Sequence, residues 1–168
     1  MDRLREEQKD IVAKYGEDFT DEAISAMKYT LAVAKETIRT NSPVKFLFRK
    51  AVQDIDIGGY HIPAGERVCL NVVERITHDE RWMEDDPTSF QPERWLREEG
   101  SKVGGFMPFG GGPRLCLGQS LSFLELRIVL AIIARHYDIQ LLDLNEKWKS
   151  FPLMTPENGM PLRVKLRT

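Results

Sequence analysis

The chain carries at positions 109 to 118 the loop Phe109-Gly110-Gly111-Gly112-Pro113-Arg114-Leu115-Cys116-Leu117-Gly118. Three consecutive glycines let the backbone reach positive φ angles and approach a flat ligand closely, and Pro113 restricts one more torsion. Cys116 stands immediately before an apolar segment with helical periodicity. Free amide hydrogens and the positive end of a helix macrodipole stabilise an anion at such a place. The pattern is therefore compatible with a thiolate at Cys116.

Two other interpretations fit parts of this loop. An isolated cysteine beside a glycine-rich loop is also typical of a packed thiol at a turn, and the loop taken alone favours that interpretation over a reactive thiolate. A phosphate-cradling loop is a second alternative. It is weaker, because the glycines are not followed by Lys-Ser/Thr and no dinucleotide-binding spacing is present.

The segment after the loop, residues 116–135, predicts a buried helix. Its apolar residues cover one face of the helix and extend onto the neighbouring sides, which indicates burial on several sides. They are Leu117, Leu121, Phe123, Leu124, Leu126, Ile128, Leu130, Ala131 and Ile132. The best candidate for a membrane span, Leu121–Ala134, is shorter than the ~20 apolar residues required and contains Glu125 and Arg127. No membrane span is expected in this chain.

The remaining periodicity predicts an α+β chain that is mainly helical. Residues 2–14 form a charged surface helix, and a second helix runs from the capping residues 19–22 to about Thr40. Alternating segments at 51–57, 60–65 and 67–72, with a Gly58-Gly59 turn, predict small antiparallel hairpins, and 138–144 pairs with 162–166. Neither a linker nor a repeat interrupts the pattern, so residues 1–168 are expected to be one unit.

Composition excludes several classes of function. With 42% hydrophobic residues, 30% charged residues and a net charge of −2, neither disorder nor bulk attraction to nucleic acid is expected. The two cysteines, Cys69 and Cys116, are too few for a disulfide-stapled fold or a multi-cysteine metal cage. Cys69 lies in a predicted strand and is interpreted as a small apolar residue without a function.

Two short motifs precede the loop. Glu36 and Arg39 are three residues apart on the second predicted helix, so they project from one face. Pairs of this kind are common on solvated helix faces and indicate little by themselves. Farther along the chain, Pro92-Glu93-Arg94-Trp95 lies in a region rich in proline, aspartate and aromatic residues that has no sustained period from 77 to 105.

Taken in order, these motifs resemble the cytochrome P450 family. The pattern Phe109-x-x-Gly112-x-Arg114-x-Cys116-x-Gly118 is similar, at every defining position, to the haem-binding signature of that family. The resemblance implies a thiolate-ligated haem b with Cys116 as the axial ligand of the iron. It also implies that Arg114 pairs with a haem propionate, that Phe109 shields the sulfur, and that Gly118 leaves room for the ring.

The same resemblance gives roles to other residues. Glu36, Arg39 and Arg94 would form a buried structural network beneath the haem. The strand from Ser42 to Arg49 would border the substrate, with Arg49 as a second propionate contact. The residues expected to line the substrate pocket are Val44, Phe46, Leu47, Leu153, Met154 and Thr155. The fold implied is the C-terminal, haem-binding part of the family's fold.

The implied activity is that of a haem-thiolate monooxygenase. Such an enzyme inserts one oxygen atom from O2 into a small apolar substrate, using electrons from a reductase or ferredoxin. An acidic donor could meet the basic side chains of Arg97, Lys102, Arg114 and Arg127. Many full-length eukaryotic relatives are anchored in the endoplasmic reticulum, which is the expected location if this chain is part of one.

One part of the family pattern has no counterpart here. Family members are considerably longer, and the N-terminal part absent from this chain holds a distal helix with the oxygen-activating element Ala-Gly-x-x-Thr. Without that part nothing in the sequence would exclude water from the oxygen-binding face. The alternative function is therefore a non-catalytic haem-binding fragment or a truncated gene product.

Overall fold

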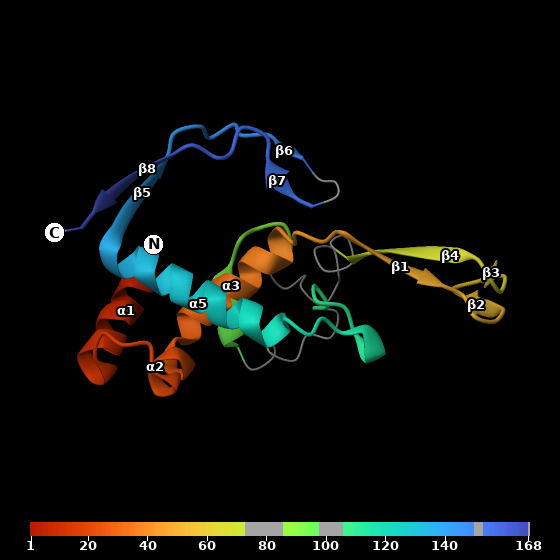
Figure 1. Ribbon diagram of the computed structural model, residues 1–168, viewed down its shortest axis with the longest axis horizontal. Helices are drawn as coiled ribbons and strands as arrows, with labels where there is room; N and C mark the ends of the chain where they lie inside the picture. The colour runs from red at the N-terminus through yellow and green to blue at the C-terminus, as the bar shows by residue number, and fades with distance from the viewer. Residues whose placement is uncertain (73–85, 98–105, 150–152, 168) are drawn as a thin grey trace.

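The computed structural model describes residues 1–72, 86–97, 106–149 and 153–167. Much of the irregular segment predicted at 77–105, including Lys102, lies outside the described residues. Two kinds of structure make up the rest, a group of helices and several two-stranded antiparallel ribbons (Figure 1). The prediction of a mainly helical α+β chain is confirmed.

The helical part consists of α1 (Asp2–Tyr15), α2 (Asp21–Ala26), α3 (Lys28–Thr40) and α5 (Gln119–His136). Helix α5 contacts each of the other three. The core between them is built from apolar side chains that are at most 9% exposed; they include Leu4, Ile11, Ala23, Met27, Val33, Ala131 and Ala134. Because Ala131 and Ala134 have short side chains, the neighbouring helices can approach α5 closely at these positions.

The prediction of one continuous helix to Thr40 is wrong, because the chain leaves helical geometry at Met27. Met27 has φ −73° and ψ 71°, and its side chain is fully buried in the core. The break exposes amides at the start of α3, and the Glu7 carboxylate of α1 accepts from the backbone nitrogens of Tyr29 at 2.5 Å and Thr30 at 2.8 Å. A cap from another helix leaves no local signal in the sequence.

The hairpin predicted around Gly58-Gly59 is confirmed: β2 (Ile55–Ile57) pairs with β3 (Tyr60–Ile62), although β2 is shorter than the predicted segment 51–57. The strand predicted at 67–72 is β4 (Arg67–Asn71), and it pairs with β1 (Phe46–Lys50), which precedes that segment. The β2–β3 turn uses Gly58 at φ 57° and Gly59 at φ 83°, angles that side chains with a Cβ rarely adopt.

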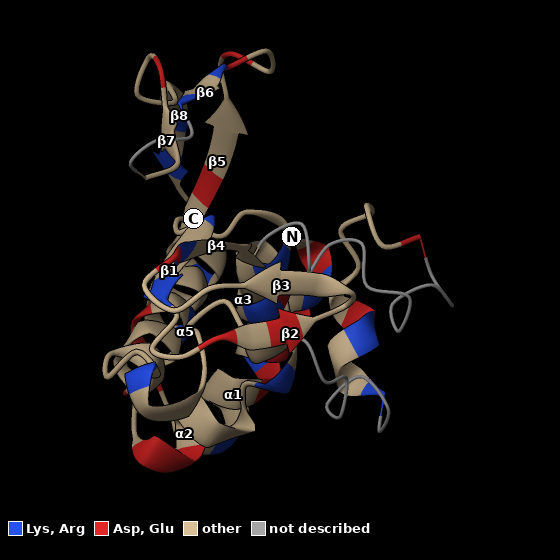
Figure 2. Ribbon diagram, turned by 90° about the vertical axis from the view of Figure 1, so that its right-hand side faces the viewer, with Lys and Arg blue, Asp and Glu red and all other residues tan. Residues whose placement is uncertain are grey.

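The second predicted pairing joins β5 (Tyr137–Leu141) to β8 (Leu162–Leu166), and β6 (Trp148–Lys149) pairs with β7 (Thr155–Pro156) inside it. Figure 1 shows the β1–β4 ribbon extending from one end of the helical part and the β5–β8 ribbon from the other. Figure 2 shows basic and acidic segments interspersed over the helices, in keeping with the small net charge.

The prediction that α5 is buried on several sides needs correction. Only Ala131 and Ala134 of this helix are buried, whereas Leu121 is 57% and Val129 52% exposed. Helices α1, α2 and α3 pack against α5, and within the described residues they leave its Leu121 and Val129 exposed. Among the described residues no helix is both long and apolar enough to cross a bilayer.

Candidate functional site

The loop that precedes α5 is held by its own backbone. The Cys116 nitrogen donates to the Phe109 carbonyl at 3.0 Å, and the Leu115 nitrogen donates to the Gly112 carbonyl at 3.1 Å. Gly112 has φ 65°, in the left-handed region that favours glycine. Cys116 is a free, exposed thiol that lies three residues before the first residue of α5, where the chain has already turned toward the helix.

An apolar cavity adjoins this thiol. Its volume is about 710 Å³, within the range of roughly 300–1,000 Å³ typical of small-molecule sites. Its walls come from the end of α3, the 41–47 segment, the cysteine loop and α5, which are far apart in the sequence. Most of the lining residues are apolar, among them Ile38, Val44, Leu47, Phe109, Leu126 and Val129.

Three residues of the predicted haem signature meet at this cavity. Cys116, Arg114 and Phe109 all line it. The Phe109 ring also packs edge to face against Phe123 of α5, with ring centroids 5.3 Å apart. A Cβ placed on Gly118 would stand 3.7 Å from the Cys116 sulfur, which is ordinary van der Waals contact, so Gly118 lies close to the thiol.

The lining side chains suit an apolar group that carries a metal and carboxylates. A thiolate is a soft ligand that suits iron, and a guanidinium fork suits a carboxylate. Arg114 makes no side-chain hydrogen bond or ion pair with the described residues, so its donors are available to a ligand. The donor set and the volume therefore agree with a haem.

Arg49, the second residue predicted to contact a haem propionate, is placed outside the cavity lining. Arg49 does not line the cavity; its Nη1 donates to the neighbouring Phe48 carbonyl at 2.9 Å, and the side chain is exposed. Strand geometry puts Arg49 on the same face of β1 as Leu47, which does line the cavity. The structure thus places Arg49 near the site without bringing it into contact.

The residues predicted to border a substrate divide into two groups. Val44 and Leu47 line the cavity, whereas Phe46 points to the other side of β1 and is 40% exposed. In the 153–155 segment, the backbone nitrogen of Met154 donates to the Pro43 carbonyl at 3.3 Å. This hydrogen bond brings the segment beside residues 43–47, which form part of the cavity wall. Leu153 and Thr155 are exposed and do not line the cavity.

The fully buried carboxylate of Glu36 is the centre of a hydrogen-bonded network next to this site. Glu36 Oε1 accepts from Arg39 Nη2 at 2.8 Å and from Arg94 Nε at 3.1 Å, and Oε2 accepts from Arg39 Nε at 2.8 Å. Glu36 and Arg39 are 0% exposed and Arg94 is 3% exposed. The structure thus brings together the three residues expected to form a network.

The two guanidinium groups also hold the segment before η2 (Pro92–Leu96), a 3₁₀ helix. Arg39 donates to the carbonyls of Pro87 at 2.6 Å and Ser89 at 3.0 Å, and Arg94 donates to that of Asp86 at 3.2 Å. Backbone carbonyls that would otherwise lie unpaired against α3 are thereby satisfied. The network joins α3 to a segment some fifty residues later, as the separations of 48 and 50 positions show.

Burial by itself raises the pKa of the Glu36 carboxyl, but its hydrogen bonds more than offset this effect. Donors on Arg39, the Gln91 backbone and the Trp95 indole hold the pKa below its ordinary value of 4.5. The Trp95 Nε1 bond to Glu36 Oε2, at 2.8 Å, was not predicted from the sequence. A tryptophan directly after the arginine is a signal that could have found it, because a buried indole N–H needs an acceptor.

Of the basic side chains predicted to face a partner, Arg97, Arg114 and Arg127 lie within the described residues. Arg127 donates to the Phe123 carbonyl at 3.1 Å and to the Ile24 carbonyl at 3.2 Å, so it joins α5 to α2. Arg114 lines the cavity, and Lys102 lies outside the described residues. Sequence reasoning also missed Glu125, a carboxylate of α5 that lines the cavity among apolar side chains.

Comparison with known proteins places this arrangement in a family. The cytochrome P450 family model matches residues 1–164. Cholesterol 22-monohydroxylase CYP90B51 of Trigonella foenum-graecum is 35% identical over 97% of this chain, and cytochrome P450 26A1 of Xenopus laevis is 33% identical over 86%. These matches cover 35% and 29% of the two relatives, so the chain spans about a third of their length.

Among solved structures, the retinoic acid-bound cyanobacterial CYP120A1 matches this chain with a TM-score of 0.88 and 26% sequence identity. The match covers 99% of this chain and 38% of the CYP120A1 chain. Both the sequence matches and the fold therefore point to the same group of proteins, and they extend over the cysteine loop, α5 and the Glu36 network. The chain belongs to the cytochrome P450 family.

Proposed function

We propose that the chain is the haem-binding part of a haem-thiolate monooxygenase and that Cys116 is the axial ligand of haem b. The observation that carries the proposal is the meeting of Cys116, Arg114 and Phe109 at one apolar cavity of about 710 Å³. When bound, haem supplies the redox chemistry that activates dioxygen, and thiolate ligation favours cleavage of the O–O bond.

In this proposal each residue of the loop has a separate role. Cys116 presents its sulfur to the iron from a backbone fixed by the bond between the Cys116 nitrogen and the Phe109 carbonyl, at 3.0 Å. Arg114 pairs with a propionate of the haem, because its guanidinium is unpartnered among the described residues and carries a permanent charge. Phe109, wedged against Phe123, keeps water from one side of the sulfur.

The Glu36 network has a positioning role. It ties α3, whose end lines the cavity, to η2 through buried charge-assisted hydrogen bonds. Since Glu36, Arg39 and Arg94 do not line the cavity, they act through the backbone that they hold. We expect their loss to reduce haem retention by distorting the cavity.

The proposed substrate is a small apolar molecule. Val44 and Leu47 give this chain an apolar wall beside the thiol, and the backbone of Met154 lies against the same segment. The names of two similar proteins support this class, since one is a cholesterol 22-monohydroxylase and the other was solved with retinoic acid. A reductase or ferredoxin would supply two electrons, one at a time, as the family resemblance implies.

The proposal is tested by the absorption spectrum of the chain reconstituted with haem, reduced, and exposed to carbon monoxide. We expect the red-shifted Soret band of a thiolate-ligated haem. Cys116→Ala should abolish this band, and Cys69→Ala should leave it intact because Cys69 faces Phe48 across the β1–β4 ribbon. An unchanged band in Cys116→Ala would overturn the assignment.

The enzyme is separated from its alternative in the chain completed by an N-terminal part that carries the oxygen-activating element. There the enzyme predicts oxygenated product from an apolar substrate with an electron donor and O2, whereas a haem-binding fragment without catalysis predicts the thiolate band but no product. Arg114→Gln adds a second readout, because loss of a propionate contact should weaken haem affinity without changing the position of the band. A shifted band in Arg114→Gln would contradict the role given to this arginine.

A further inference from the structure

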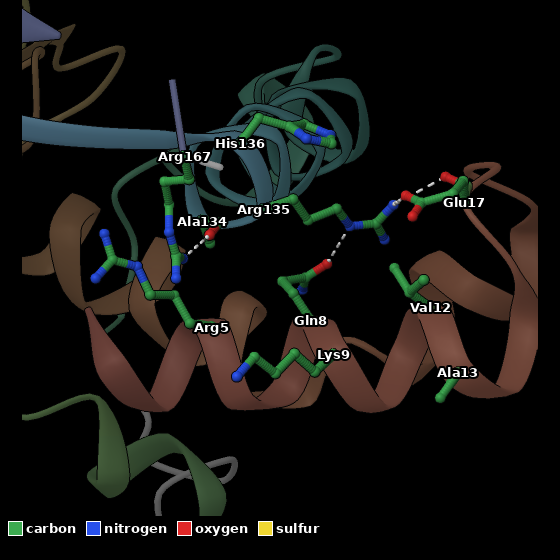
Figure 3. Close-up of a pocket in the computed structure, with 10 residues that line it drawn as sticks. All are labelled: Arg5, Gln8, Lys9, Val12, Ala13, Glu17, Ala134, Arg135, His136 and Arg167. Atoms are coloured by element: carbon green, nitrogen blue, oxygen red, sulfur yellow. Dashed lines mark hydrogen bonds and ion pairs between the residues drawn. The ribbon is translucent and has the colours of Figure 1, made fainter. Parts of the chain in front are cut away.

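The β5–β8 ribbon is attached to the helices at one end and carries an exposed turn near the other. Arg167, which follows β8, donates through Nη1 to the Ala134 carbonyl of α5 at 3.0 Å (Figure 3). Figure 1 shows β6 and β7 beyond the far end of β5 and β8. The chain turns between β7 and β8, and this turn contains Asn158 and Gly159, both of which are exposed.

Asn158 and Gly159 form a chemically reactive pair. The backbone nitrogen that follows an asparagine can attack the carbonyl carbon of the asparagine side chain, and a side chain on the following residue hinders this attack. Glycine removes the hindrance, because it has no Cβ. Of the asparagines in the sequence, Asn158 is the one that precedes a glycine. A Cβ on Gly159 would meet nothing within 4 Å, so the space beside its nitrogen is open among the described residues.

Neither of the two reacting groups is held by a hydrogen bond. The backbone nitrogen of Asn158 donates to Glu146 Oε1 at 2.7 Å, but the Asn158 carboxamide makes no hydrogen bond with the described residues. The Gly159 nitrogen likewise has no acceptor in the part of the chain that the structure describes. A hydrogen bond at either group would have to break before the nitrogen could attack. That cost is absent from this turn.

We propose that Asn158 is a site of spontaneous deamidation, and that its conversion loosens the β6–β7 ribbon. The Gly159 nitrogen loses its proton to solvent and bonds to Cγ of Asn158, while the bond from Cγ to Nδ2 breaks and ammonia leaves. One water then opens the five-membered succinimide at either carbonyl carbon. Release of the nitrogen from Cγ gives aspartate, and release from the main-chain carbon gives isoaspartate. Water is consumed and ammonia is released, with no change of oxidation state.

The new carboxylate would stand beside two others. Glu157 precedes position 158, and the Glu146 carboxylate accepts from the backbone nitrogen of residue 158. Glu146 Oε2 is buried and has no hydrogen-bond partner among the described residues, so no donor there offsets an added negative charge. Isoaspartate also lengthens the main chain by one atom. Both changes act at the residue that follows β7, whose pairing with β6 adjoins the Met154 hydrogen bond to Pro43.

The chemistry is tested by incubating the 168-residue chain at mildly alkaline pH and following its tryptic peptides by mass spectrometry. Cleavage after lysine and arginine places Asn158 in the peptide 150–163 and Asn145 in the peptide 136–147. Asn145 is the matched control, because it is also exposed on this ribbon but precedes Glu146. We expect Asn158 to deamidate about tenfold faster than Asn145. Equal rates at the two asparagines, or an unmodified Asn158, would overturn the proposal.

Two variants at this exposed position test the effect on the ribbon. Asn158→Asp carries the charge of the product, whereas Asn158→Gln stays neutral and should not deamidate, because its longer side chain disfavours ring closure. Hydrogen exchange of the Met154 amide reports on its bond to Pro43. We expect exchange about twofold faster in Asn158→Asp than in Asn158→Gln, as for carboxylates that repel each other near water. Equal exchange in the two variants would show that deamidation leaves the ribbon unchanged, against the proposal.

Discussion

The indole nitrogen of Trp95 donates a hydrogen bond of 2.8 Å to Oε2 of the buried Glu36 carboxylate. Trp95 is 8% exposed, and its ring packs edge to face against Phe106 with centroids 4.5 Å apart. The tryptophan therefore does two things at once: it completes the donors around a buried charge and covers that charge from solvent. Trp95, which is 59 positions from Glu36 along the chain, is thus part of the same network as the Glu36–Arg39 pair.

Trp95→Phe removes the indole donor and keeps an aromatic ring. We expect the free energy of unfolding to fall by about 1.5–3 kcal/mol, the range for hydrogen bonds to charged groups. Urea denaturation measures the change. Trp148→Phe is the control, because Trp148 is 48% exposed and should change stability by less than about 0.5 kcal/mol. Equal effects of the two variants would contradict the role assigned to Trp95.

Glu36→Gln leaves two buried guanidinium groups without their shared counter-charge. We expect a loss of about 3–5 kcal/mol in the free energy of unfolding, as for other buried pairs that lose one partner. The comparison is Arg3→Gln, which breaks the Arg3–Glu93 ion pair at the surface, where the side chains are 52% and 45% exposed. That exposed pair should contribute at most about 1 kcal/mol. A Glu36→Gln protein as stable as Arg3→Gln would refute this prediction.

The lowered pKa of Glu36 predicts a dependence of stability on pH. Because the folded-state pKa lies below the ordinary value of 4.5, the network stabilises the fold fully above that value. The contribution is lost as the pH falls through the folded-state pKa. The difference in unfolding free energy between wild type and Glu36→Gln should therefore shrink when measured at about pH 3 instead of about pH 7.

Two other carboxyl groups also have lowered pKa values, but their contributions to stability cancel in the difference between wild type and Glu36→Gln. Hydrogen bonds from Thr88 lower the pKa of Asp86, and a backbone hydrogen bond lowers that of Glu93. Both residues are present in wild type and in Glu36→Gln, so the difference between the two proteins isolates Glu36. A difference that stays constant from neutral to acid pH would show that Glu36 does not titrate as expected.

Two neighbouring glycines of the cysteine loop should respond differently to alanine. Gly112 has φ 65°, so Gly112→Ala is strained by about 1–2 kcal/mol even though its Cβ would meet open space. Gly111 has extended backbone with φ −164°, and a Cβ there would meet only the flexible end of Met107 at 2.8 Å. We expect Gly112→Ala to weaken haem retention and Gly111→Ala to have a small effect, as measured by the fraction of haem kept after gel filtration.

The local features of this protein could be predicted from its sequence. The glycines and proline before Cys116, the glycine turn at 58–59 and the alternating strands act over a few residues, since they depend on which backbone angles each residue type allows. The order of the Cys116, Glu36 and Arg94 motifs was sufficient to predict the family. These features are short-range in origin and therefore visible in the chain itself.

Only the tertiary structure decided which distant residues meet. The break at Met27 depends on a cap from Glu7 of α1, and the environment of Glu36 includes Trp95 from a segment far along the chain. The exposure of one face of α5 likewise follows from which helices pack together. Periodicity shows that a face is apolar or a residue charged, but burial and pairing are set by neighbours that the local sequence does not contain.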